Sequence, residues 1–125
     1  MNKFLAEFIG TYALVFFGTG AIIVNQEVNG VITNVGIAII FGLIVMAMIY
    51  TLGNVSGAHI NPEVSIAFAI AKRLPLHQLF PYIGCQIAGG IAASLTLKFL
   101  FPLNGQLGAT FPQNNCNIKR MIHRV

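Results

Sequence analysis

Three long apolar stretches dominate the sequence and are separated by shorter polar segments. They cover residues 4–24, 31–52 and 79–101. Each is close to the ~20 apolar residues that a helix needs to cross roughly 30 Å of hydrocarbon. The first could instead be a signal peptide, but its apolar core is too long, Glu7 interrupts its start and no clear cleavage site follows. The pattern therefore predicts three transmembrane helices.

The segment between the second and third stretches has a different pattern. Glycines, His59 and an Asn-Pro pair interrupt any continuous helix in its first half. Asn61 is a good N-cap, and Pro62 suits the first helical position because its missing N–H has no partner there. Residues 64–71 then form an apolar helix of about two turns, which is too short to cross a membrane.

This short helix ends on a charged side. Lys72 and Arg73 follow it, and Pro75 stops it. We therefore expect residues 53–71 to enter the membrane as a loop and to return as a half-helix. Irregular backbone at that depth requires either burial in protein or a water-filled cavity. The expected fold class is an all-α membrane protein with three transmembrane helices and one re-entrant half-helix.

The composition agrees with a membrane environment. Of the 125 residues, 56% are hydrophobic and 8% charged, whereas a soluble domain carries about 25% charged residues. So little charge argues against a cytosolic enzyme and against a nucleic-acid partner, and it makes membrane lipid the expected partner. The net charge of +4 does not change this, because three cations lie close together near the C-terminus: Lys119, Arg120 and Arg124.

Cysteine and histidine spacing predicts neither a disulfide framework nor a metal site. Cys85 lies in an apolar stretch and Cys116 in a polar tail. The three histidines, His59, His77 and His123, are far apart, and no cysteine stands at a ligand spacing from any of them. We expect no cofactor.

Positive charges beside the apolar stretches predict the orientation. Lys3 and the Lys72-Arg73 pair flank one side, whereas residues 25–30 contain no cation. Because cations beside spans favour the cytoplasm, we expect a multi-pass protein of the cell membrane with a cytoplasmic N-terminus. Three crossings place the C-terminus outside, and the basic tail near residues 119–124 disagrees with that placement.

The re-entrant segment carries the candidate chemistry. The carbonyls of Gly57, Ala58 and His59 precede a helix N-terminus and form a ladder of acceptors, and the side-chain amide of Asn61 is a donor. The half-helix dipole adds partial positive charge. Such a lining passes small neutral molecules that form hydrogen bonds and repels cations. The alternative is that Asn61 and the following proline only form a tight turn that caps a short helix.

At these residues the sequence resembles the aquaporin family, also called major intrinsic proteins. Residues 6–11 (AEFIGT) look like the first-helix motif of that family, and residues 56–62 (SGAHINP) look like its first pore loop. The resemblance covers about residues 3–112. It implies an architecture of two inverted repeats whose Asn-Pro-Ala tips meet at the pore centre. The chain contains one such repeat, so the second tip and the family's selectivity-filter arginine are missing.

Two features depart from the family pattern. The family's Asn-Pro-Ala reads Asn61-Pro62-Glu63, and residues 113–125 form a polar, basic tail unlike the family. We therefore assign residues 1–112 to an aquaporin-like N-terminal repeat, and a truncated or frameshifted reading frame would explain the tail. Glu63 either stabilises the half-helix N-terminus, which is the favoured role, or faces the lumen and weakens cation exclusion.

The resemblance also suggests roles for residues outside the loop. The family acid corresponding to Glu7 is buried and accepts hydrogen bonds from pore-loop N–H groups, whereas the sequence alone also allows an acid that reaches the membrane surface. Gln86 either joins helices or braces the loop. Phe41 stands where phenylalanine accompanies water channels in the family, although such a residue is more often a packing or lipid-facing aromatic. Small residues four apart, Gly84, Ala88 and Ala92, predict a helix-packing face.

The main hypothesis is a passive channel for water or other small neutral solutes. Its pathway would comprise Phe41 and the loop residues Gly57, Ala58, His59, Asn61, Pro62 and Glu63. Further partners implied by the resemblance are a second aquaporin repeat and a homotetramer. The alternative is a non-conducting membrane fragment that at most associates with intact homologues. A third hypothesis is a membrane enzyme using Glu63 as acid or base, which would need a second catalytic group that only His59 could supply.

Overall fold

The structure is a computed structural model that describes residues 1–109, and in this part of the chain helices are the regular secondary structure, without a strand. The helices are α1 (Lys3–Glu27), α2 (Thr33–Ser56), α3 (Pro62–Ile70) and α4 (Leu76–Leu100). By length and composition α1, α2 and α4 can each cross a membrane, whereas α3 is short. The expected fold class, an all-α membrane protein with three spanning helices and one half-helix, is confirmed.

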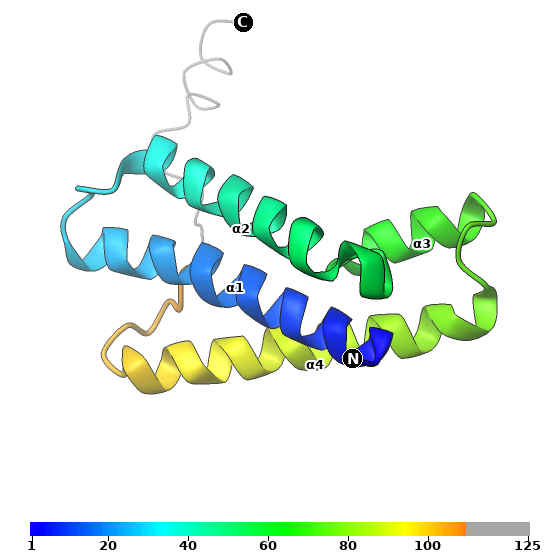
Figure 1. Cartoon of the computed structure of the whole chain (residues 1–125). Helices are drawn as coiled ribbons and strands as arrows, with labels where there is room; N and C mark the ends of the chain where they lie inside the picture. Colours follow the sequence, from blue (N-terminus) through cyan, green and yellow to red (C-terminus); the bar gives the residue numbers. More distant parts are fainter. Residues whose placement is uncertain (110–125) are drawn as a thin grey trace, which may run out of the picture.

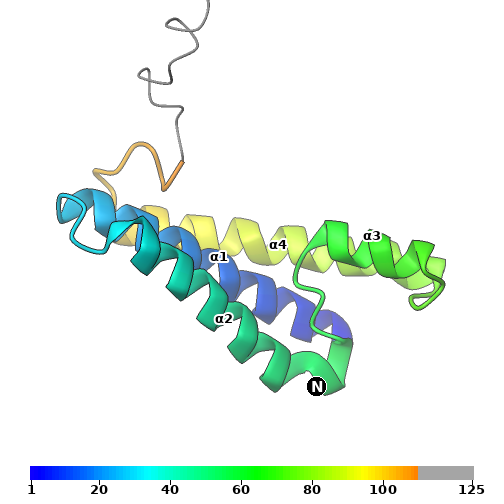
Figure 2. The same cartoon turned by 90° about the horizontal axis from the view of Figure 1, so that it is seen from above.

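Helix α1 lies between α2 and α4 and contacts both of them, while α3 contacts α4 (Figure 1). Seen from the second direction, α3 lies beside the N-terminal half of α4, beyond the end of α2 (Figure 2). The chain therefore turns back after α2, so that the loop at residues 57–61 sits where α1, α2, α3 and α4 meet.

Close packing of α1 on α4 depends on a glycine. A Cβ at Gly89 of α4 would collide with the carbonyl oxygen of Phe8 and would lie 3.2 Å from the backbone N of Tyr12, both in α1. The neighbouring Ala93 is fully buried. The packing face of α4 therefore follows Gly89 and Ala93. The expected face at Gly84, Ala88 and Ala92 is not the one that meets α1, because Gly84 and Ala88 are exposed within residues 1–109.

The end of α2 also differs from the expected one. The helix continues through Gly53 to Ser56, so the loop begins four positions later than the sequence pattern suggested. Gly53 remains helical, whereas Gly57 takes a left-handed conformation with φ +88° and donates its N–H to the Gly53 carbonyl. Glycine adopts this conformation without steric cost and is the common helix terminator.

Helix α3 begins as the sequence indicates. Asn61 is extended, and its Oδ1 accepts a hydrogen bond from the Glu63 N–H at 2.8 Å, while Pro62 occupies the first helical position. The helix ends at Ile70, after which the N–H groups of Arg73 and Leu74 both donate to the Phe68 carbonyl. These contacts fix both ends of the half-helix.

Candidate functional site

The buried carboxylate of Glu7 is the centre of the loop region. Its Oε1 accepts hydrogen bonds from Ser56 Oγ at 2.6 Å and from the His59 N–H at 3.0 Å. Its Oε2 accepts from the Ile60 N–H at 2.7 Å and from Gln86 Nε2 at 2.8 Å. Glu7 is 0% exposed, so it does not reach the membrane surface. An ionised carboxylate only accepts, and here four donors satisfy it.

These hydrogen bonds hold a backbone that is otherwise unfavourable. Ala58 and Ile60 have positive φ angles of 47° and 46°, a region that β-branched residues almost never occupy. Each such residue costs about 1–3 kcal/mol unless its surroundings impose the conformation. Gly10 of α1 contributes space, because a Cβ there would collide with Cγ2 of Ile60. The sequence of α1 therefore shapes a loop some fifty positions away.

The loop turns its N–H groups inward and leaves its carbonyls free. The N–H of Ala58 donates to Ser56 Oγ at 3.1 Å, and the N–H groups of His59 and Ile60 donate to Glu7. Within residues 1–109, the carbonyls of Gly57, Ala58 and His59 accept no hydrogen bond. A carbonyl without a partner is an acceptor for a solute. The three consecutive carbonyls that the sequence suggested as acceptors are thus unpaired within residues 1–109.

The start of α3 offers a donor and an acid. Asn61 is exposed, and since its Oδ1 is used by the Glu63 N–H, its Nδ2 group has no partner in the described part of the chain. Pro62 is half-buried. The Glu63 side chain is exposed and makes no hydrogen bond within residues 1–109. The Asn61 amide donor and the Glu63 carboxylate are therefore both exposed at the start of α3.

Gln86 has both of the roles that the sequence left open, because it joins helices and also braces the loop. It joins α4 to α1 through Glu7, and its Nε2 also donates to Ser65 Oγ of α3 at 2.9 Å. Gln86 thereby connects α4 both to the acid that holds the loop and to the half-helix that follows it. Its Oε1 is buried without a partner in the described residues.

Sequence reasoning missed three residues of this network, namely Ser56, Ser65 and Tyr82. Ser65 is fully buried and lies 3.0 Å from Nδ1 of His59, and the Tyr82 hydroxyl donates to the Ser56 carbonyl at 2.8 Å. Ser65 carried one usable signal, because it is a polar residue inside an otherwise apolar half-helix. Tyr82 carried none, since tyrosine is common in membrane helices.

Phe41 lies apart from the loop. It is half-buried on α2, and its ring covers Gly18 of α1 so closely that a Cβ at Gly18 would collide with it. The structure brings Glu7 and Gln86 together with the loop residues but does not bring Phe41 to them. A role for Phe41 in a constriction stays a prediction.

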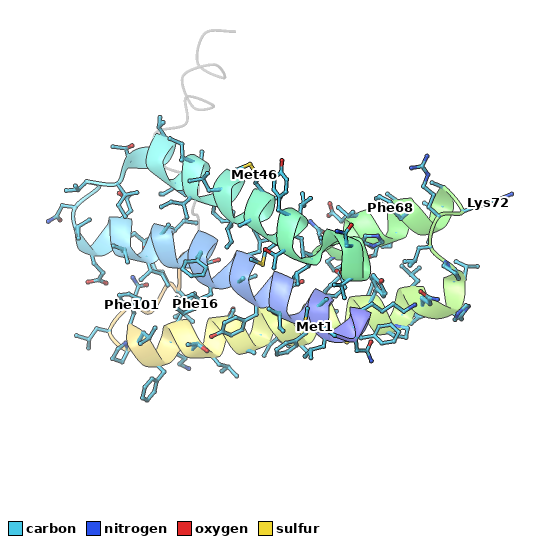
Figure 3. All side chains as sticks on the ribbon, viewed as in Figure 1. Met1, Phe16, Met46, Phe68, Lys72 and Phe101 are labelled. Atoms are coloured by element: carbon cyan, nitrogen blue, oxygen red, sulfur yellow. The ribbon has the colours of Figure 1, made fainter. Side chains whose placement is uncertain are left out.

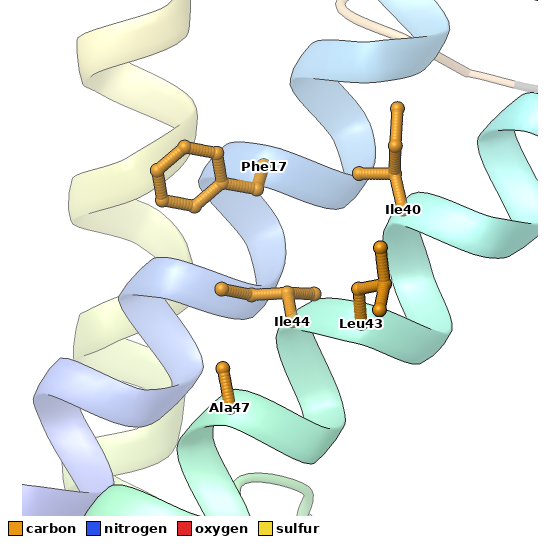
Figure 4. A pocket seen from close by; sticks show the side chains of 5 residues that line it. All are labelled: Phe17, Ile40, Leu43, Ile44 and Ala47. Carbon is orange, nitrogen blue, oxygen red and sulfur yellow. The ribbon is translucent and has the colours of Figure 1, made fainter.

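An apolar groove lies between α1 and α2 near Phe41. It has a volume of about 280 Å³ and is lined by Phe17 of α1 and by residues of α2 (Figure 4), namely Ile40, Leu43, Ile44 and Ala47. Its lining has almost no polar surface, so it offers a polar solute no hydrogen bond. The groove is therefore no candidate for the solute pathway. Among residues 1–109 no group of three acidic, histidine or cysteine side chains could hold a metal ion.

Comparison with known families agrees with this geometry. A family profile described as "Major intrinsic protein" matches residues 1–123. The chain belongs to the major intrinsic protein family. Members of this family are channels and not enzymes, so the membrane-enzyme hypothesis is excluded. The three apolar helices agree with a membrane protein.

Several similar proteins are plant aquaporins by name. The chain is 54% identical to putative aquaporin NIP4-1 of Arabidopsis thaliana over 100 residues, which are 80% of this chain and 35% of that protein. It is 42% identical to nodulin-26 of Glycine max over 123 residues, 98% of this chain and 45% of the relative. Aquaporin NIP1-1 of Oryza sativa subsp. japonica is 46% identical over 101 residues, 81% of this chain and 36% of the relative. The chain thus spans less than half the length of these relatives.

Proposed function

We propose that the chain supplies one repeat of a passive channel for water or other small neutral solutes, with the loop at residues 57–63 as its part of the pathway. The supporting observation is that the loop N–H groups have partners within the protein whereas the loop carbonyls do not. Glu7 and Ser56 bind its N–H groups, and the carbonyls of Gly57, Ala58 and His59 remain free.

In this function the loop replaces part of a solute's hydration shell. A water molecule leaving bulk solvent loses hydrogen bonds, and a row of fixed carbonyl acceptors with the Nδ2 donor of Asn61 returns them. Because Glu7 holds the carbonyls in place, little reorganisation is needed as each molecule passes. The N-terminal dipole of α3 adds partial positive charge at Asn61, which disfavours cations. No step is catalytic.

A second repeat is the expected partner. Helix α3 exposes several large apolar side chains, including Val64, Ile66 and Phe68. Phe68 is labelled in Figure 3, on the half-helix beyond the end of α2. Because the hydrocarbon contains no water, each loop N–H or C=O group that faces lipid without a partner costs several kcal/mol. An inverted repeat, supplied by another chain or by a longer version of this one, would cover the loop and complete the pathway. A homotetramer of completed channels belongs to the same proposal.

We propose that the N-terminus faces the cytoplasm of a cell. Met1 and Lys72 lie toward one end of the bundle and Phe101 toward the other (Figure 3). Lys3 Nζ donates to Gln78 Oε1 at 2.6 Å, which holds this cation beside the start of α4. Lys3, Lys72 and Arg73 therefore share one end, and the positive-inside rule places that end in the cytoplasm.

The test is a completed channel in which residues 1–109 are joined to the matching second half of nodulin-26. Stopped-flow light scattering of proteoliposomes measures osmotic water permeability. We expect permeability well above that of protein-free vesicles, and a lower value for Asn61→Leu, which removes the donor. A completed channel that inserts and folds but adds no permeability would refute the proposal.

The alternative function, a non-conducting fragment that associates with intact homologues, rests on the exposed apolar face of α3 and on the limited coverage of the relatives. Co-purification of the tagged chain with full-length nodulin-26 from one membrane tests it. Association without any permeability in the completed channel would favour this alternative.

A further inference from the structure

The hydroxyl of Ser65 lies at a junction of three elements and is one of the fully buried polar groups. Gln86 Nε2 of α4 donates to Ser65 Oγ at 2.9 Å, and Nδ1 of His59 in the loop lies 3.0 Å from the same oxygen. Ser65 itself is 0% exposed. The hydroxyl therefore connects the brace from α4 to the imidazole of the loop, and it has no access to water.

The chemistry of the groups fixes the direction of the hydrogen bonds that Gln86 makes and leaves the Ser65 hydroxyl proton for the His59 ring. The Glu7 carboxylate only accepts, so Gln86 must present its NH₂ group to it. The second N–H of that group then donates to Ser65 Oγ. The hydroxyl proton of Ser65 remains available, and Nδ1 of His59 is the side-chain group recorded next to it in the described residues. When Ser65 donates to Nδ1, the ring proton sits on Nε2.

The other ring nitrogen, Nε2, makes no hydrogen bond within residues 1–109 and lies beside Gly57, which is exposed although His59 itself is 6% exposed. A Cβ at Gly57 would lie 3.2 Å from Nε2, so the glycine leaves this nitrogen uncrowded. The rings of Phe68 and Tyr82 flank the imidazole, with centroids 4.5 and 5.2 Å away. These two rings restrict rotation of the imidazole, so its two nitrogens keep separate surroundings.

Two titratable groups face His59 from the packed helices. Glu7 of α1 accepts from the backbone N–H of His59. Tyr82 of α4 directs its hydroxyl to the Ser56 carbonyl. Neither group contacts Nδ1 by a hydrogen bond, so the Ser65 hydroxyl is the polar group that acts on this nitrogen within the described residues.

We propose that Ser65 is a positioning residue whose hydroxyl holds the His59 imidazole in the neutral tautomer with its proton on Nε2. The loop then presents a ring N–H donor beside the unpaired carbonyls of Gly57 and Ala58. The consequence for solute passage rests on the proposed channel function, whereas the tautomer itself does not.

The tautomer can be measured on the 125-residue chain in lipid by ¹⁵N NMR of labelled histidine. His77→Gln and His123→Gln leave His59 as the single imidazole. We expect the proton on Nε2 in this background and in Ser65→Thr, which keeps the hydroxyl. Ser65→Ala should give a mixture that includes the Nδ1–H form. Ser94→Ala, which removes an exposed hydroxyl of α4, is the matched control and should change nothing.

A proton on Nδ1 in the parent, or an unchanged tautomer in a folded Ser65→Ala, would overturn the inference. Should Ser65→Ala fail to fold, the parent spectrum still decides. In the completed channel we expect Ser65→Ala to lower water permeability and Ser65→Thr to preserve it. An impermeable parent channel with the Nε2–H tautomer would refute the channel function alone, and a permeable channel with the wrong tautomer would refute this inference alone.

Discussion

Gln86 Nε2 donates to Glu7 Oε2 over 2.8 Å, and this hydrogen bond joins two helices whose residues stand 79 positions apart in the chain. The same carboxylate oxygen accepts from the backbone of Ile60. A single buried acid therefore couples the packing of α1 on α4 to the conformation of the loop between α2 and α3. Contacts with other helices impose the loop conformation, which the loop residues themselves do not favour.

Replacing Glu7 by glutamine should destabilise the fold by about 2–6 kcal/mol. Each carboxylate oxygen accepts two donors, and an amide NH₂ in place of either oxygen leaves two donors without an acceptor, at about 1–3 kcal/mol each. Thermal or denaturant unfolding in detergent measures the loss. Glu27→Gln, at the exposed end of α1, is the matched control and should change stability little. Equal stability of the two variants would show that the network contributes nothing.

Gly89→Ala should push α1 away from α4. The added methyl group would meet the Phe8 carbonyl, which belongs to helical backbone and cannot easily move. Overpacking of this kind costs about 1–3 kcal/mol. Gly84→Ala is the control, because a Cβ there has no neighbour within 4 Å and alanine favours a helix by roughly 0.5–1 kcal/mol over glycine. The prediction fails if both variants unfold at the same temperature.

The sequence predicts the helices well but not their contacts. Apolar length alone indicates α1, α2 and α4, and Asn61 with Pro62 marks the start of α3. Spacing cannot decide which small residue of α4 meets α1, because Ala88 and Gly89 are adjacent and both occur at helix-packing faces. It also leaves both roles of Glu7 open, since the loop N–H groups that bind this acid are 52 and 53 positions away. Ser65 was missed for the same reason, because its partners come from other elements.

Glu63→Ala should lower cation conductance in the completed channel. The carboxylate is exposed in the first turn of α3, beside Asn61, and has no partner in the described residues. A negative charge there offsets the partial positive charge of the helix N-terminus that repels cations. Glu63→Gln, which keeps the size of the side chain, should behave like alanine. Equal conductance of sodium or protons in all three proteins would leave Glu63 with only its helix-stabilising role, worth about 0.3–1 kcal/mol.

Phe41 should favour water over glycerol in the completed channel. An aromatic ring of this size narrows a constriction and leaves little room for a three-carbon polyol. Phe41→Ala should therefore raise glycerol permeability relative to water permeability, measured by stopped-flow shrinkage with each osmolyte. Phe17→Ala, in the apolar groove between α1 and α2, is the control. Glycerol permeation as fast as water in the parent would contradict the prediction.

The 125-residue chain by itself should not conduct water. Its loop carbonyls at Gly57, Ala58 and His59 have no partner within residues 1–109, and without an inverted repeat they face lipid. A second copy inserted the same way up cannot supply that repeat. Lys3 and the Lys72-Arg73 pair lie toward one end and bias every copy to one orientation.

Pairing of copies in opposite orientations would restore a pathway only if this bias were weak. Osmotic permeability of vesicles containing the purified chain tests conduction, and protease accessibility of its termini reports orientation. We expect permeability equal to that of protein-free vesicles and a single orientation. Lys3→Gln combined with Lys72→Gln and Arg73→Gln removes the cations at this end and leaves Lys98 and the basic residues 119–124, so copies should also insert in the opposite orientation. High permeability of the unmodified chain, with copies in both orientations, would show that two inverted copies of one repeat can form a channel.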